Sequence, residues 1–100
     1  MATQINVSLL SMDPEADPQH FAVEVLSDDG SKTTHQITLH KELYVRLTGG
    51  LKSPEELIRA SFEFLLDKEP KENILPTFDL GEIQKFFPEY EVIVSSQLSK

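Results

Sequence analysis

Regularly spaced acidic residues are the first side chains in this sequence that could bind an ion. Asp13, Glu15 and Asp17 alternate along the chain, and Glu24 is the twelfth residue counted from Asp13. These positions match acidic positions of a calcium-binding loop, but Pro18 stands where that loop requires glycine for its sharp turn. Strands are also expected on both sides, where a calcium loop has helices. We therefore expect an acidic, solvated loop without bound metal and keep weak metal binding as a third interpretation.

The three histidines form no recognisable catalytic or metal-binding pattern. His35 shares the parity of Ile37 and Leu39 in an alternating segment, so a partly buried strand position is expected for it. His20 and His40 are expected at the surface. The sequence contains no cysteine, no glycine–serine nucleophile motif and no phosphate-binding glycine loop. We therefore expect a protein that is not an enzyme and has no cofactor.

Aromatic side chains near the C-terminus are candidates for contact with another protein. Phe86, Phe87 and Tyr90 lie close together in the sequence, and aromatic rings contribute much of the binding energy at protein interfaces. The alternative is that these rings close over the core of their own chain.

A helix over residues 53–68 is the element around which the other segments must be arranged. Ser53 and Glu56 have the spacing of a capping box, and Pro54 suits the first helical position. Pro70 disfavours helical geometry at the preceding residue and ends the helix. Apolar residues occupy most of the helix circumference, so it must be covered on two sides. The second cover is either the C-terminal segment of the same chain or a partner subunit.

Three alternating segments before this helix predict a three-stranded antiparallel meander. Apolar residues recur at every second position over 5–9 and 21–25, and a third alternating set consists of His35, Ile37 and Leu39. Asp29 with Gly30 suits a tight hairpin turn. One face of this sheet is apolar and needs a helix packed on it. The predicted fold class is therefore α+β, with the meander packed on the helix over residues 53–68.

Two shorter helices complete the predicted fold. Residues 41–47 favour a short helix, with a strand as the alternative. A C-terminal helix is predicted over residues 79–87, where Asp79 is the expected N-cap and Glu82 completes a capping box.

Length and composition indicate one domain over residues 1–100, with an ordered core over about 4–90. Residues 91–100 carry strand-like side chains and are equally compatible with a loose tail. No apolar run approaches the roughly 20 residues of a membrane span, and the first residues lack signal-peptide features. A cytoplasmic protein is therefore expected. The net charge of −8 disfavours binding to nucleic acid or to an anionic membrane.

The C-terminal half resembles a known group of sequences. Three motifs in this half are similar to those of a group of short prokaryotic proteins of uncharacterised function. They are SFEFLLDKEPKENIL over residues 61–75, FDL over 78–80 and FFPEYE over 86–91. This resemblance implies neither an activity nor a ligand.

A second resemblance, at the level of pattern, covers residues 34–68. A strand, a short helix, a glycine turn and a capped helix in this order are similar to ribbon-helix-helix DNA-binding proteins. In that family two chains pair their strands in the major groove and a helix N-terminus meets phosphate. The resemblance implies a homodimer with DNA contacts from the following residues: Thr34, Gln36, Thr38, Lys52 and Ser53.

The sequence thus favours a small, non-catalytic protein-interaction or regulatory module whose partner is another protein or a second copy of the chain. A dimeric DNA-binding regulator of the ribbon-helix-helix type is the alternative.

Overall fold

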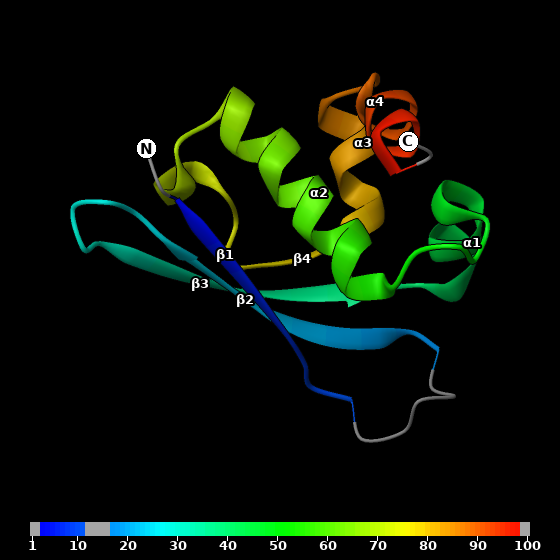
Figure 1. The fold of residues 1–100 in the computed structure, drawn as a ribbon, viewed down its shortest axis with the longest axis horizontal. Coiled ribbons are helices and arrows are strands. Elements are labelled where there is room, and N and C mark those ends of the chain that lie inside the picture. Colours follow the sequence, from blue (N-terminus) through cyan, green and yellow to red (C-terminus); the bar gives the residue numbers. More distant parts are fainter. Residues whose placement is uncertain (1–2, 12–16, 99–100) are drawn as a thin grey trace.

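A four-stranded mixed sheet carries the main helices on one side (Figure 1). This computed structural model describes residues 3–11 and 17–98 of the 100-residue chain. The strands lie in the order β1-β2-β3-β4, with these bounds: β1 Gln4–Leu9, β2 Gln19–Leu26, β3 Lys32–Leu39 and β4 Thr77–Asp79. The helices and 3-10 turns are α1 Lys41–Thr48, α2 Pro54–Lys68, η1 Lys71–Asn73, η2 Leu80–Glu82, α3 Ile83–Phe86 and α4 Tyr90–Leu98.

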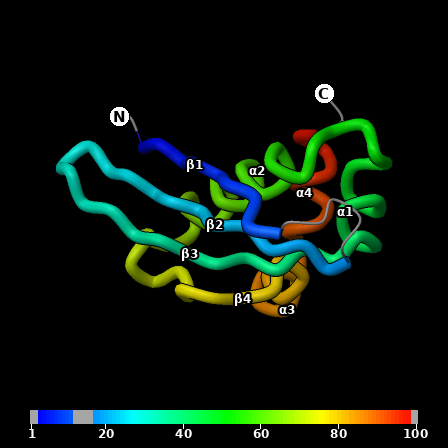
Figure 2. Tube along the Cα trace, turned by 90° about the horizontal axis from the view of Figure 1, so that it is seen from below, coloured from blue at the N-terminus to red at the C-terminus, as the bar shows by residue number. Residues whose placement is uncertain are grey.

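The strands β1, β2 and β3 form the predicted antiparallel meander, but a fourth strand extends the sheet. β4 runs parallel to β3, with Ile37 opposite Phe78. The sequence prediction missed this strand because it contains only three residues, too few for an alternating pattern to be recognised. The sheet is therefore mixed, with β1 and β4 at its opposite edges (Figure 2).

The helix α2 begins and ends where its sequence signals predict. The Ser53 hydroxyl accepts a hydrogen bond from the Glu56 N–H, and the Glu56 carboxylate accepts one from the Ser53 N–H. Glu69 is extended before Pro70 and ends the helix. Residues 41–47 are helical, within α1, which ends at a left-handed Gly49 with φ of 64°.

The core lies on both sides of α2. Leu57, Ile58 and Phe62 are fully buried, and the strands contribute buried side chains such as Phe21 and Val23 from below. On the other side, Tyr90 and Val94 of α4 are fully buried. The second cover therefore comes from the C-terminal segment of the same chain.

The C-terminal third refines one prediction and corrects another. The helix expected over residues 79–87 is present from Leu80 to Phe86, but its first three residues form the 3-10 turn η2 and only the last four, α3, are α-helical. Its predicted capping box between Asp79 and Glu82 is present, and Pro88 follows soon after the end of α3. The sequence predicts a strand or a loose tail for residues 91–100, but residues up to Leu98 belong to α4. Burial against α2 outweighs the strand propensity of its valines and isoleucine.

No helix formed by residues 3–11 and 17–98 combines the length and the apolar character needed to cross a membrane.

Candidate functional site

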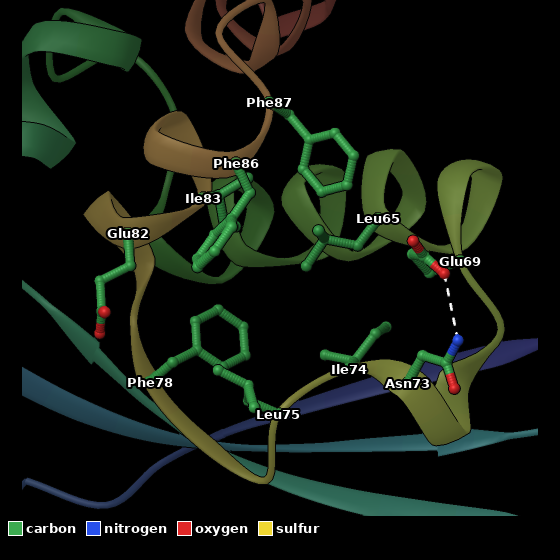
Figure 3. A pocket seen from close by; sticks show the side chains of 10 residues that line it. All are labelled: Leu65, Glu69, Asn73, Ile74, Leu75, Phe78, Glu82, Ile83, Phe86 and Phe87. Carbon is green, nitrogen blue, oxygen red and sulfur yellow. Dashed lines mark hydrogen bonds between the residues drawn. The ribbon is translucent and has the colours of Figure 1, made fainter.

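An open apolar pocket of about 480 Å³ lies between the end of α2, the segment after it and α3 (Figure 3). Residues from α2, η1, β4, η2 and α3 and from the loops between them line it. They are Leu65, Glu69, Asn73, Ile74, Leu75, Phe78, Glu82, Ile83, Phe86 and Phe87.

The chain reverses direction around this pocket because of two local signals and one long-range strand pairing. Pro70 ends α2, and the chain then passes through η1 and an extended segment into β4. Pairing with β3 fixes β4 beneath the pocket. The Asp79–Glu82 capping box then starts the turn into α3, which forms the opposite wall (Figure 3).

The floor and the α3 wall of the pocket contain buried side chains, and its mouth exposes large apolar ones. Ile74, Phe78 and Ile83 are buried. At the mouth, Leu75 exposes 54% of its surface and Phe86 exposes 68%. An exposed phenylalanine beside a preformed apolar hollow is a common feature of binding sites.

The polar groups at the pocket are two carboxylates and one amide. The Glu69 carboxylate accepts a hydrogen bond from Asn73 Nδ2 at 3.2 Å (Figure 3). The Glu82 carboxylate accepts one from the Asp79 N–H at 3.2 Å. Since the lining contains no lysine, arginine or histidine, its charge is negative.

His35 holds the loop that carries Leu75. Its Nδ1 lies 2.7 Å from the Leu75 carbonyl oxygen and its Nε2 lies 2.9 Å from the Thr33 hydroxyl. A carbonyl only accepts, so Nδ1 carries a proton and donates to it. The ring is buried and lies 5.3 Å from the Phe62 ring. His35 is thus a core strand residue, as its parity predicts, and it positions one lip of the pocket.

The three aromatic residues predicted as an interaction surface are separated by the fold. Phe86 and Phe87 line the pocket, and the Phe87 ring packs edge-on against Phe64 at 5.7 Å. Tyr90 is fully buried and does not belong to that surface. Its hydroxyl lies 2.7 Å from the Ser61 hydroxyl, and burial raises its pKa well above the usual range.

The residues implied by the ribbon-helix-helix resemblance do not form one surface. Thr34, Gln36 and Thr38 alternate with the core-facing residues of β3 and so lie on the outer face of the sheet. Lys52 and Ser53 lie at the start of α2, which packs on the inner face. In addition, β3 is paired with β2 along its whole length and with β4 from Gln36 to Thr38. The part of β3 that carries Gln36 and Thr38 therefore has no free edge with which to form a ribbon with a second chain.

The acidic positions of the calcium-loop interpretation are only partly described. Asp13 and Glu15 lie outside the described residues. The Asp17 carboxylate accepts a hydrogen bond from the Lys41 N–H at 3.0 Å. The Glu24 carboxylate forms an ion pair with Lys32 Nζ of β3 at 3.6 Å. Among the described residues, no group of three or more histidines or acids could hold a metal ion.

The two remaining histidines are exposed, as expected. His40 Nε2 lies 2.7 Å from the Asp79 carboxylate, and His20 Nδ1 lies 3.2 Å from the Thr38 hydroxyl. The His20 contact joins β2 to β3, and the His40 contact joins the start of α1 to β4.

Comparison with protein-family models, curated proteins and solved structures found no match to this chain. The function therefore has to be inferred from the site itself.

Proposed function

We propose that this protein is a small, non-catalytic interaction module that binds a protein partner by receiving an apolar side chain in the pocket beside α2. The observation that carries the proposal is the exposure of Phe86 and Leu75 around a preformed apolar hollow of about 480 Å³. That volume lies in the range of about 300–1,000 Å³ typical of ligand pockets. A cytoplasmic location is part of the same proposal.

The charge of the pocket indicates the chemistry of the partner. Glu69 and Glu82 stand at an apolar site that lacks basic residues, in a chain with a net charge of −8. A partner segment with an apolar anchor flanked by lysine or arginine would bring complementary charge. A fatty acid would bring its own carboxylate to two others, so this charge disfavours it as the ligand.

The proposal can be tested by NMR titration with a short capped peptide in which one phenylalanine is flanked by lysines. We expect amide shift changes at Leu75 and Ile83, because the phenylalanine ring enters between them. The same peptide with alanine in place of phenylalanine should bind at least roughly tenfold more weakly, since it loses the buried aromatic area.

Two protein variants form a matched pair for this test. Phe86→Ser removes an exposed ring at the pocket, and Val92→Ser removes an apolar side chain of similar exposure, 72%, on α4. Phe86→Ser should weaken peptide binding and Val92→Ser should not. Equal effects of the two substitutions, no shifts at the pocket, or tighter binding of decanoate than of the peptide would each contradict the proposal.

A further inference from the structure

The outer edge of β1 is a strand edge without the usual protection against pairing. Natural edge strands carry charged residues, proline or bulges that prevent pairing with other chains. Residues 3–11 contain no charged residue and no proline, and the register between β1 and β2 runs without interruption from Gln4 to Leu9. Next to this edge, Leu9 and Leu10 expose 44% and 48% of their surfaces.

The hydrogen-bond pattern shows which backbone groups point outward from this edge. The Leu10 N–H donates to the His20 carbonyl of β2 at 2.8 Å. Successive residues of a strand direct their N–H and C=O groups to opposite sides. Ser8, Asn6 and Gln4 therefore also direct these groups towards β2. The residues between them, Ile5, Val7 and Leu9, direct theirs away from the sheet.

We propose that two copies of this chain pair antiparallel along β1, with Val7 opposite its own copy on a twofold axis. In this register Ile5 lies opposite Leu9 of the second copy and Leu9 opposite Ile5. Each of the three outward residues then exchanges N–H and C=O bonds with one residue of the other strand, so the edge is complementary to itself. The two sheets become one continuous sheet.

The side chains and charges agree with this pairing. The outward residues have their side chains on the core face, so the exposed Leu9 gains an apolar neighbour in Ile5 of the second copy. On the outer face, Asn6 and Ser8 oppose each other across the axis, and both are neutral. Two chains that each carry a net charge of −8 repel one another. Because β1 carries no charge, pairing along it does not place like charges directly opposite each other.

The dimer leaves the pocket open, because β1 and β4 form opposite edges of the sheet (Figure 2). The pairing thus goes beyond the proposed peptide binding and does not depend on it.

The experiment uses two double variants of the full chain that differ only in the sign of the charge at residue 8. Asn6→Lys with Ser8→Lys places like charges opposite each other at both symmetric positions of the outer face. Asn6→Lys with Ser8→Glu places opposite charges there. Sedimentation equilibrium should show a concentration-dependent dimer for the wild type. The dimer dissociation constant should be roughly tenfold or more higher for the Lys/Lys variant than for the Lys/Glu variant.

Amide hydrogen exchange gives a second readout at single residues. Raising the protein concentration should slow exchange at Ile5, Val7 and Leu9, whose N–H groups point outward. The amides of Asn6 and Ser8 are already bonded to β2 and should change little. A wild type that stays monomeric up to about 1 mM, equal dissociation constants for the two variants, or protection confined to other surfaces would overturn the proposal.

Discussion

The C-terminal segment covers α2 differently at two places. Around Tyr90, here called the closed end, it buries side chains against α2, and around Phe86, the open end, it leaves the pocket beside α2. Tyr90 is fully buried against Ser61, whereas Phe86, only four residues earlier, exposes 68% of its surface at the pocket. The difference follows from the helices that carry them. The helix α4 has nine residues and places Tyr90 and Val94, one turn apart, on α2. The helix α3 has only four residues, and Pro88 follows it. The longer helix thus buries two side chains one turn apart, whereas the short α3 ends at the exposed Phe86 beside the pocket.

Replacement of Tyr90 by alanine should produce the largest loss of stability at the closed end. It removes a fully buried ring that packs against Phe64 at 5.5 Å, and the cavity left behind should cost about 3–5 kcal/mol. Urea unfolding followed by circular dichroism measures this. A loss below about 1 kcal/mol would mean that Tyr90 is not part of the core.

The hydroxyl pair at the closed end can be tested by two smaller changes. Ser61 donates to the Leu57 carbonyl at 2.8 Å, so the Tyr90 hydroxyl is the donor towards Ser61. Ser61→Ala leaves the Tyr90 hydroxyl buried without this partner and should cost about 1–3 kcal/mol. Tyr90→Phe leaves Ser61 bonded to Leu57 and should cost about 1 kcal/mol. The reverse order in urea unfolding would show that the donor assignment is wrong.

Alkaline pH should lower the free energy of unfolding through ionisation of the same tyrosine. Burial raises the pKa of Tyr90 above its usual value of about 10, so the folded chain keeps the phenolic proton when the unfolded chain has lost it. This contribution is fully present below pH of about 10 and is lost at about 1.4 kcal/mol per pH unit above it. The free energy of unfolding, measured from pH 9 to 11, should decline less for Tyr90→Phe than for the wild type. Parallel curves would contradict the assignment.

Substitution of Phe86 at the open end should have the smallest effect on the free energy of unfolding. Phe86→Ser removes a ring that is mostly exposed, so the free energy of unfolding should change by about 0.5 kcal/mol or less. Thermal unfolding next to the Val92→Ser control measures this. A loss as large as that of Tyr90→Ala would show that Phe86 is a core residue and would remove the distinction between the two ends.

Much of the framework could be predicted from sequence, but the site could be predicted only in part. The bounds of α2, the two capping boxes, the meander and the helix over 41–47 all depend on short-range patterns. Of the ten pocket residues, the sequence singled out Phe86 and Phe87 as candidates for contact with another protein. Leu75 carried no such signal, because it reads as an ordinary apolar residue in a short turn. Its place at the mouth depends on a hydrogen bond to His35, forty residues earlier.

The sequence by itself determined where α1, α2 and the hairpin begin and end, because caps, prolines and alternating residues act over a few neighbouring positions. Only the tertiary structure decided that residues 77–79 join β3 and that the valine-rich segment after Tyr90 is helical. It also decided which aromatic ring is buried and which is exposed. These outcomes depend on contacts between segments far apart in the chain, and burial against a distant surface outweighs local preference.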